Sequence, residues 1–316
     1  MLRGIKKATP LGEIEILDAH AHFFSHRFFQ TLASQSNELK QLENPFEKIA
    51  EKTGWEMPSP DPVDLATRWQ AELDRHSVSA ALLIASVPGD EESVAKAIAA
   101  FPDRFRGGFF FDPTQPTAEQ RARRAFNDLG LSVACLFPAM HSYSVSDCEG
   151  ANIVAAIASE KPGRAVFVHC GALSVGVRKK LDLPCHFDLT KSSPLDLHKL
   201  AKRYPNTKFI IPHFGAGLFR ETLMVADLCP NIYLDTSGTN QWIKYDPSLT
   251  NLTQIFRRAI EVVGYDRLLF GTDSSFFPRG WNASVLEAQI NSLLEIKADD
   301  KQVASVLGAN LRSLVA

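Results

Sequence analysis

The feature that most constrains the fold is a regular alternation of short apolar segments with longer amphipathic ones. Each short segment is rich in β-branched or aromatic residues and stops at a polar residue, a glycine or a proline. Nearly continuous apolar runs of this length are typical of parallel strands buried on both faces. Eight of them follow one another along the chain, at residues 13–20, 79–86, 105–113, 132–138, 165–171, 208–215, 232–238 and 267–275.

Most segments between these strands carry apolar residues at helical spacing. Two of the helices have a favourable start, with Asp61 before Pro62 and Ser193 before Pro194. Helices are expected at residues 61–76, 91–100, 118–129, 151–159, 194–204, 216–228, 252–263 and 285–296, with a short one near 300–307. Eight strand–helix units joined by right-handed crossovers close into a barrel. The sequence therefore predicts an α/β fold, a (β/α)8 TIM barrel.

A barrel of this kind typically takes about 250 residues, so we expect residues 1–316 to form a single domain. An open, doubly wound sheet is the rival fold, but it usually has a glycine-rich phosphate turn after its first strand, and DAHAHFF (18–24) contains none. Two connections are long, residues 25–61 and 172–193. The first is rich in aromatic residues, which predicts an inserted helical segment, either a lid over the barrel mouth or a cover of its rim.

Composition excludes several classes of function. The net charge of −2 and the lack of a long basic run argue against nucleic-acid binding. No apolar run approaches the roughly 18 residues of a membrane span. The five cysteines are scattered and form no C-x-x-C pair, which fits reduced thiols. Because the first residues also lack the apolar region of a signal peptide, we expect a cytoplasmic protein that binds neither nucleic acid nor membrane.

Polar residues gather where the expected strands end. The first strand ends in His20 and His22, the fifth in His169, the sixth in His213 and the eighth in Asp273. A (β/α)8 barrel builds its active site at this edge. Imidazole and carboxylate groups suit Zn²⁺, Fe²⁺ or Mn²⁺. Because alternate residues of a strand share a face, Asp18 is expected on the same face as His20 and His22.

Four motifs of this chain resemble the amidohydrolase superfamily, and more closely its amidohydrolase-2 branch. They are D-A-H-A-H (18–22), F-V-H-C-G (167–171), I-P-H-F-G (211–215) and F-G-T-D-S (270–274). The resemblance implies His20, His22, His169 and Asp273 as metal ligands, with His213 and Asp273 managing protons. Two-metal relatives carry a modified lysine or a glutamate at the end of the fourth strand. ACLFPAM (134–140) has neither, so we expect one divalent ion, zinc ahead of iron or manganese.

The resemblance leaves the reaction open. Metal-assisted hydrolysis of an ester, lactone or amide is our first expectation, and non-oxidative decarboxylation is the alternative within the branch. A metal-free lactonase of the same fold and a catalytically retired barrel that serves as a binding protein are further alternatives. The complete set of ligand residues argues against a retired barrel.

The substrate is expected to be a small, carboxylated organic molecule. Recognition of a carboxylate favours an arginine. Arg178, Arg220 and Arg279 follow strands on the functional side of the barrel, and His141 and Tyr143 follow the fourth strand. We expect Arg178, Arg279 and His141 to bind substrate. Asp18 is expected to serve a structural role or to bond an imidazole N–H. The resemblance also suggests a homodimer.

Overall fold

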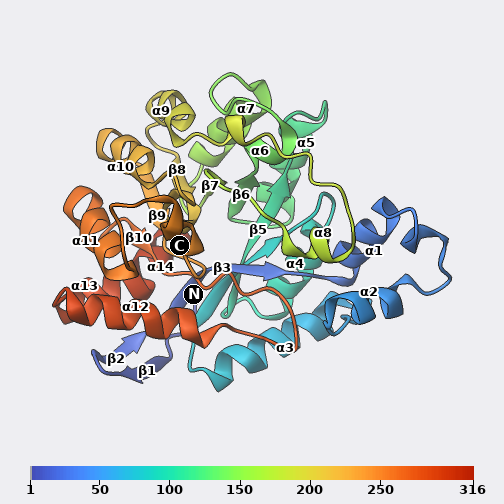
Figure 1. The fold of residues 1–316 in the computed structure, drawn as a ribbon, viewed down its shortest axis with the longest axis horizontal. Helices are drawn as coiled ribbons and strands as arrows, with labels where there is room; N and C mark the ends of the chain where they lie inside the picture. The colour runs from blue at the N-terminus through green and yellow to red at the C-terminus, as the bar shows by residue number, and fades with distance from the viewer. Residues whose placement is uncertain (1) are drawn as a thin grey trace.

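The computed structural model describes residues 2–316 and shows eight parallel strands arranged as a nearly closed barrel with helices around it (Figure 1). The strands pair in chain order, each with the next. They are β3 (Leu17–Phe23), β4 (Ala80–Ala85), β5 (Phe105–Phe111), β6 (Val133–Leu136), β7 (Ala165–Val168), β8 (Lys208–Ile211), β9 (Ile232–Asp235) and β10 (Leu268–Leu269). The predicted (β/α)8 barrel is confirmed.

The outer ring consists of helices that follow the strands, close to the predicted positions. They are α3 (Pro62–Arg75), α4 (Glu91–Ala100), α5 (Ala118–Arg123) continued by η2 (Arg124–Asp128), α7 (Glu149–Ser159), α9 (Pro194–Arg203), α10 (Phe219–Leu228), α11 (Leu252–Val263) and α12 (Ala283–Glu295). Asp61 and Ser193 cap α3 and α9 as expected, since their side chains accept from Val63 N and Leu195 N. The chain ends in α13 (Asp300–Ala304), η6 (Ser305–Ala309) and α14 (Asn310–Leu314).

The start of the first strand was predicted wrongly. Residues 13–15 belong to an antiparallel hairpin of β1 (Lys6–Thr9) and β2 (Gly12–Glu15), and the barrel strand begins only at Leu17. Gly12, at φ 98°, makes the tight turn of this hairpin. The two chain ends lie close together at the amino end of the barrel (Figure 1), where Leu2, Leu314 and Val315 pack against its interior side chains.

The last strand is much shorter than predicted. Only Leu268 and Leu269 pair with β9, and the chain then reaches β3 through separate bonds. Ala19 N donates to Phe270 O at 2.8 Å, His22 N to Ser274 O at 2.7 Å, and Asp273 N to His20 O at 2.9 Å. These three bonds close the barrel beside His20, His22 and Asp273.

The side chain of Asp18 also forms hydrogen bonds across this junction between β3 and residues 270–274, which we call the seam. The buried carboxylate accepts from His20 N at 2.9 Å, Thr272 N at 3.0 Å and Trp281 Nε1 at 2.8 Å, and also from Thr272 Oγ1. Burial raises the pKa of Asp18 to about 6, although these hydrogen bonds oppose the shift. Its partners are main-chain and outer-layer groups, so Asp18 is structural and bonds no imidazole.

The predicted helical insertion after the first strand is present. It comprises α1 (His26–Gln35), η1 (Leu39–Gln41) and α2 (Pro45–Thr53). We call residues 24–57 the β3–α3 loop and residues 172–193, which contain α8 (Gly176–Lys180) and η3 (Leu189–Lys191), the β7–α9 loop. Phe28, Phe29 and Trp55 of the first loop share a hydrophobic cluster with Val177 and Leu181 of the second. The two loops therefore pack on each other rather than on the barrel core alone.

We predict that Asp18→Ala destabilises the fold by about 3 kcal/mol, because it leaves buried N–H and O–H donors of Thr272 and Trp281 without an acceptor. Urea unfolding followed by circular dichroism measures the change. Glu13→Ala, at an exposed position of β2, is the matched control and is expected to stay within about 0.5 kcal/mol of wild type. Equal stability of the two variants would show that Asp18 does not hold the seam.

Candidate metal and active site

Three side chains converge at the carboxyl end of the barrel. His20 and His22 lie on β3, and Asp273 follows β10. His20 Nε2 is 3.3 Å from His22 Nε2 and 3.7 Å from Asp273 Oδ1, and His22 Nε2 is 3.2 Å from the same oxygen. Among residues 2–316, these three form the group whose donor atoms all lie within 4.8 Å of one another.

Partners behind the two imidazoles fix which ring nitrogen faces the cluster. His20 Nδ1 donates to Asp235 Oδ2 at 2.6 Å, and Asp235 is completely buried. His22 Nδ1 donates to Ser86 Oγ at 2.7 Å, while the Ser86 hydroxyl donates to the Ile84 carbonyl. With both Nδ1 atoms protonated, both Nε2 atoms carry lone pairs toward each other and toward a carboxylate. Three acceptors packed this closely are stabilised by a positive charge between them, either a metal ion or a proton.

A divalent ion fits this arrangement. Donor atoms around a tetrahedral ion at 2.0–2.1 Å are separated by about 3.3 Å, close to the observed edges of 3.2–3.7 Å. His169, which follows β7, provides a second observation consistent with a metal site. Its buried Nδ1 has no hydrogen-bond partner in the described chain. The His169 ring lies 5.4 Å from the ring of His213 and lines the same cavity. His169 is therefore close to the cluster without belonging to its tightest group.

The electrostatics of the cluster agree with a site for a cation. Burial lowers the pKa of His20, but Asp235 outweighs it and raises that pKa to about 9. Burial and the neighbouring imidazoles hold the pKa of His169 well below its usual range. Burial raises the pKa of Asp273, yet the hydrogen bond from His22 and the charges of His20 and His213 bring it below its ordinary value. The raised pKa of His20 favours a proton on this ring when no metal ion is bound.

His213 lies beside the cluster in a strained turn. The turn η4 (Pro212–Gly215) follows β8, and His213 adopts φ 53° within it. Asp273 adopts φ 58°. Such conformations of non-glycine residues cost roughly 1–3 kcal/mol and cluster at functional sites. The His213 ring is 5.0 Å from that of His20, and its Nδ1 is 3.1 Å from Ser237 O and 2.9 Å from Ser237 Oγ. Because a carbonyl only accepts, Nδ1 carries the proton and Nε2 keeps its lone pair.

These residues lie in a cavity of about 500 Å³ under the two loops. Seven Phe and Trp side chains contribute to its wall: Phe24, Phe28, Trp55, Phe110, Phe137, Phe167 and Phe276. Phe24 stacks on Phe28 with ring centroids 4.0 Å apart, and Trp55 stacks on Phe276 at 4.1 Å. The end of β6 contributes Phe137 and Met140 to the wall. The cavity suits a small molecule with a flat apolar body.

The residues expected to bind substrate occupy different places. Arg178 lines the cavity, but its guanidinium donates to Pro184 O and to Gln35 Oε1 at 2.7 Å, which ties the two loops together. Arg279 is exposed, is not among the lining residues of this cavity, and donates to the Asp273 carbonyl at 3.2 Å. Arg220 is exposed and pairs with Glu221. His141 lines the cavity.

Three functional neighbours were missed from the sequence. Asp235 and Ser86 hold the two histidines, and Ser237 Oγ lies 3.0 Å from His20 Nδ1 and 2.9 Å from His213 Nδ1. Asp235 did carry a signal, since it is a carboxylate at the end of an expected strand, like Asp273. Lys180 also lines the cavity, and its ammonium group donates to Thr53 O at 2.8 Å.

The prediction that Asp18 shares a face with His20 and His22 was wrong. The pairing of β3 with β4 shifts register between Asp18 and Ala21, and such an irregularity breaks the two-residue alternation. Asp18 therefore bonds Trp281, which belongs to the layer between barrel and helices, whereas His20 packs edge-on against Phe167 of the barrel interior.

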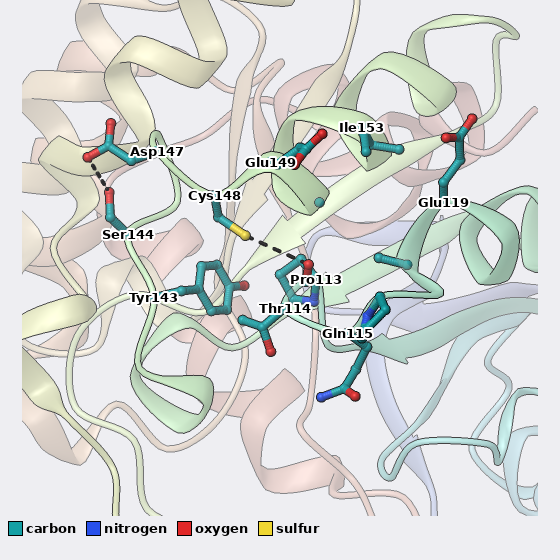
Figure 2. A pocket seen from close by; sticks show the side chains of 13 residues that line it. Pro113, Thr114, Gln115, Glu119, Tyr143, Ser144, Asp147, Cys148, Glu149 and Ile153 are labelled. Carbon is teal, nitrogen blue, oxygen red and sulfur yellow. Dashed lines mark hydrogen bonds between the residues drawn. The ribbon is translucent and has the colours of Figure 1, made fainter.

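Figure 2 shows a separate groove of about 650 Å³ between the loop after β5 and the start of α7. Its lining includes Tyr143, Cys148 and Glu119, and it shares no lining residue with the cavity that contains the histidines. Tyr143, considered from the sequence as a neighbour of the barrel mouth, faces this groove instead. The groove holds no cluster of metal-ligand type, and we assign the chemistry to the histidine cavity.

The fold and the site define a (β/α)8 barrel with a metal-ligand type cluster at the carboxyl ends of its strands. The sequence pattern of the amidohydrolase family, Amidohydro_2, matches residues 17–314. The chain belongs to this family, as its motifs had suggested.

Known proteins resemble the chain to different extents. Protein fluG of Emericella nidulans is 26% identical over 177 residues, which are 55% of this chain, and this chain spans about a fifth (19%) of fluG. An uncharacterised TIM-barrel protein from Bordetella bronchiseptica superposes with a TM-score of 0.62 at 17% identity, covering 96% of this chain and 98% of that one. These structural likenesses are distant in sequence and bear on the fold.

Two further solved structures share the fold. A probable 2-pyrone-4,6-dicarboxylic acid hydrolase from Acinetobacter baumannii gives a TM-score of 0.58 at 16% identity, with 96% and 99% of the two chains covered. An amidohydrolase from Burkholderia multivorans with bound zinc gives 0.57 at 12% identity, with 95% and 99% covered. In the described part of this chain, no helix combines the length and apolar character needed to cross a membrane.

We predict that Asp235→Ala weakens metal binding 10–100-fold although no member of the cluster changes, because His20 loses the partner that orients its ring. Competition of Zn²⁺ against a chromogenic chelator measures the affinity. Asp266→Ala removes an exposed carboxylate near β10 and should leave the affinity unchanged. Wild-type affinity in Asp235→Ala would exclude this role for Asp235.

The raised pKa of His20 predicts a pH dependence of metal binding. Below about pH 9 an ion must displace a proton from His20, so affinity should rise by up to about tenfold per pH unit between pH 7 and 8.5. Stability of the metal-free protein should change in the opposite direction. The contribution of the His20–Asp235 pair is full below pH 6.5 and is lost as the pH rises through about 9. Chelator competition and thermal melts at each pH measure both trends, and a pH-independent affinity would contradict the assignment.

Proposed function

We propose that this protein is a metal-dependent hydrolase that acts on an ester, lactone or amide of a small, carboxylated organic molecule with an apolar body. The observation that carries the proposal is the convergence of three acceptors, His20 Nε2, His22 Nε2 and Asp273 Oδ1, in an aromatic cavity. We propose zinc as the ion, with iron and manganese to be tested, because two imidazoles and a carboxylate suit all three. The Burkholderia multivorans amidohydrolase with bound zinc supports this choice.

The ion would be held by His20, His22 and Asp273, with His169 as a fourth ligand. When bound, it would supply a water of lowered pKa and a Lewis acid for the substrate carbonyl. His213 is the proposed acid/base: its Nδ1–H is held by Ser237, and its free Nε2 can take a proton from water and return it to the leaving group. Asp273 is a second proton acceptor. Asp235 keeps His20 in the tautomer that binds metal.

The cavity wall defines what the substrate can be. The stacked aromatic rings of the wall favour a flat, apolar body. A substrate carboxylate would meet Arg178 and Lys180 of the β7–α9 loop, the cations that line the cavity within the described chain. Opening of the two packed loops would admit the substrate. The five free cysteines support our proposal of a reducing, cytoplasmic location.

Metal content and turnover test this proposal together. Protein purified without chelator should carry about one Zn, Fe or Mn per chain by mass spectrometry. His20→Ala should lose the metal, because a ligand is missing. His213→Ala should keep the metal and lose 10²–10⁴-fold in turnover. His186→Ala, at an exposed position, is the matched control.

The products distinguish the competing reactions. Esters, lactones and amides of carboxylated aromatics should release acid without CO2. Release of CO2 would assign a decarboxylase instead. Turnover by protein that retains no metal after reconstitution would assign a metal-free lactonase. A metal-free protein that binds these compounds without turnover would be a binding protein built on the barrel. A fully active His213→Ala protein would refute the acid/base role.

A further inference from the structure

A second polar group lines the cavity at some distance from the metal-type cluster. His141 ends the short helix α6 (Pro138–His141) after β6, and its side chain is 15% exposed. The ring packs edge-on against Phe110 at 5.2 Å, and Phe110 stacks on Phe137 at 5.0 Å. Phe137 in turn contacts the His169 ring at 5.9 Å. A wall of aromatic rings therefore separates His141 from the cluster.

The two nitrogens of His141 have different surroundings. Nδ1 is buried without a hydrogen-bond partner, and the nearest carboxylate oxygen, Asp112 Oδ1, is 3.8 Å away. Asp112 is itself fixed at the end of β5, where it accepts from Thr114 N, Thr114 Oγ1 and Gln115 Nε2. Burial lowers the pKa of His141, and the charge of Asp112 only partly opposes this. The ring is accordingly neutral at neutral pH.

A neutral imidazole beside a fixed carboxylate has a preferred tautomer. A proton on Nδ1 points toward the negative Asp112, whereas a lone pair there would face it and be repelled. Nε2 then carries the lone pair, and the ring lines the cavity. The free nitrogen of His141 is an acceptor for a donor on a bound molecule, not a cation for a carboxylate.

We propose that His141, with its tautomer set by Asp112, is a specificity residue that selects substrates bearing an O–H or N–H donor remote from the reacting carbonyl. The aromatic wall between His141 and the cluster fits the flat body that joins the two groups. This inference rests on the proposed function, because that function places the carbonyl at His20, His22 and Asp273. Asp112 acts as a positioning residue through His141.

Substituted benzamides test the proposal, since they offer a carbonyl, a flat body and one variable group. Affinities of benzamide, 3- and 4-hydroxybenzamide, and 3- and 4-methoxybenzamide for zinc-loaded protein can be measured by ligand-detected NMR titration. One of the hydroxy compounds should bind about tenfold more tightly than benzamide, and the methoxy compound, which lacks the donor, should not. His141→Ala should abolish this preference, so that the hydroxy, methoxy and unsubstituted compounds bind with similar affinities. His141→Gln, which keeps an acceptor, should restore part of it.

Tyr143→Phe is the matched control. Tyr143 lies parallel to the His141 ring at 6.4 Å but lines the groove of Figure 2, and its hydroxyl has no partner in the described chain. This variant should keep the wild-type preference. Equal affinities of hydroxy, methoxy and unsubstituted benzamides for wild type, no binding of any of them, or a preference that survives His141→Ala would each overturn the proposal.

The tautomer provides a readout that does not depend on turnover. Nitrogen-15 NMR, with the His141 resonances assigned from the His141→Ala spectrum, should show a protonated Nδ1 and an unprotonated Nε2. Asp112→Asn should weaken that bias. A protonated Nε2 in wild type would overturn the mechanism of selection. Metal content measured on the same samples reports on the proposed function separately. A protein without metal or turnover that still prefers the hydroxy compound through His141 would refute the proposed hydrolase activity. It would nevertheless support the role of His141 in ligand selection.

Discussion

Closure of the barrel between β3 and the residues after β10 is the constraint on which the site depends. His20 and His22 lie near the start of the chain and Asp273 near its end, and only this seam brings them within 3.2–3.7 Å of each other. The main-chain bond from Asp273 N to His20 O is part of the same seam. Asp18 holds it through Thr272 and Trp281. Asp18, which stabilises the closure, and His20, a proposed metal ligand, thus lie two positions apart on one strand, on opposite sides of it.

Buried polar partners convert this proximity into a defined electrostatic state. Asp235 and Ser86 each accept a hydrogen bond from the Nδ1 of a histidine, so the Nε2 atoms of His20 and His22 face each other as acceptors. Without a cation, three acceptors at these distances repel one another. The raised pKa of His20 favours a proton that relieves this repulsion when no metal ion is bound. In the proposed site, the carboxylate of Asp235 would both orient His20 toward a metal ion and stabilise the proton that competes with that ion.

The two long loops complete the site from above. They bury aromatic side chains against each other and are joined by Arg178 to Gln35 and Lys180 to Thr53. Arg178 and Lys180 therefore join the two loops and also line the cavity.

The sequence by itself determined the strand order, the barrel and the kinds of side chain at the strand ends. These features depend on local periodicity and on the rule that parallel strands end at one edge. Tertiary structure alone decided the rest. A register shift within β3 turned Asp18 away from His20, and a contact across 215 residues made Asp235 the partner of His20. The hydrogen bonds of Arg178 to Gln35 and of Lys180 to Thr53 depend on the packing of two loops that are distant in sequence. Periodicity describes the faces of one element, whereas the direction of a side chain and its hydrogen-bond partner depend on what other elements bring against it.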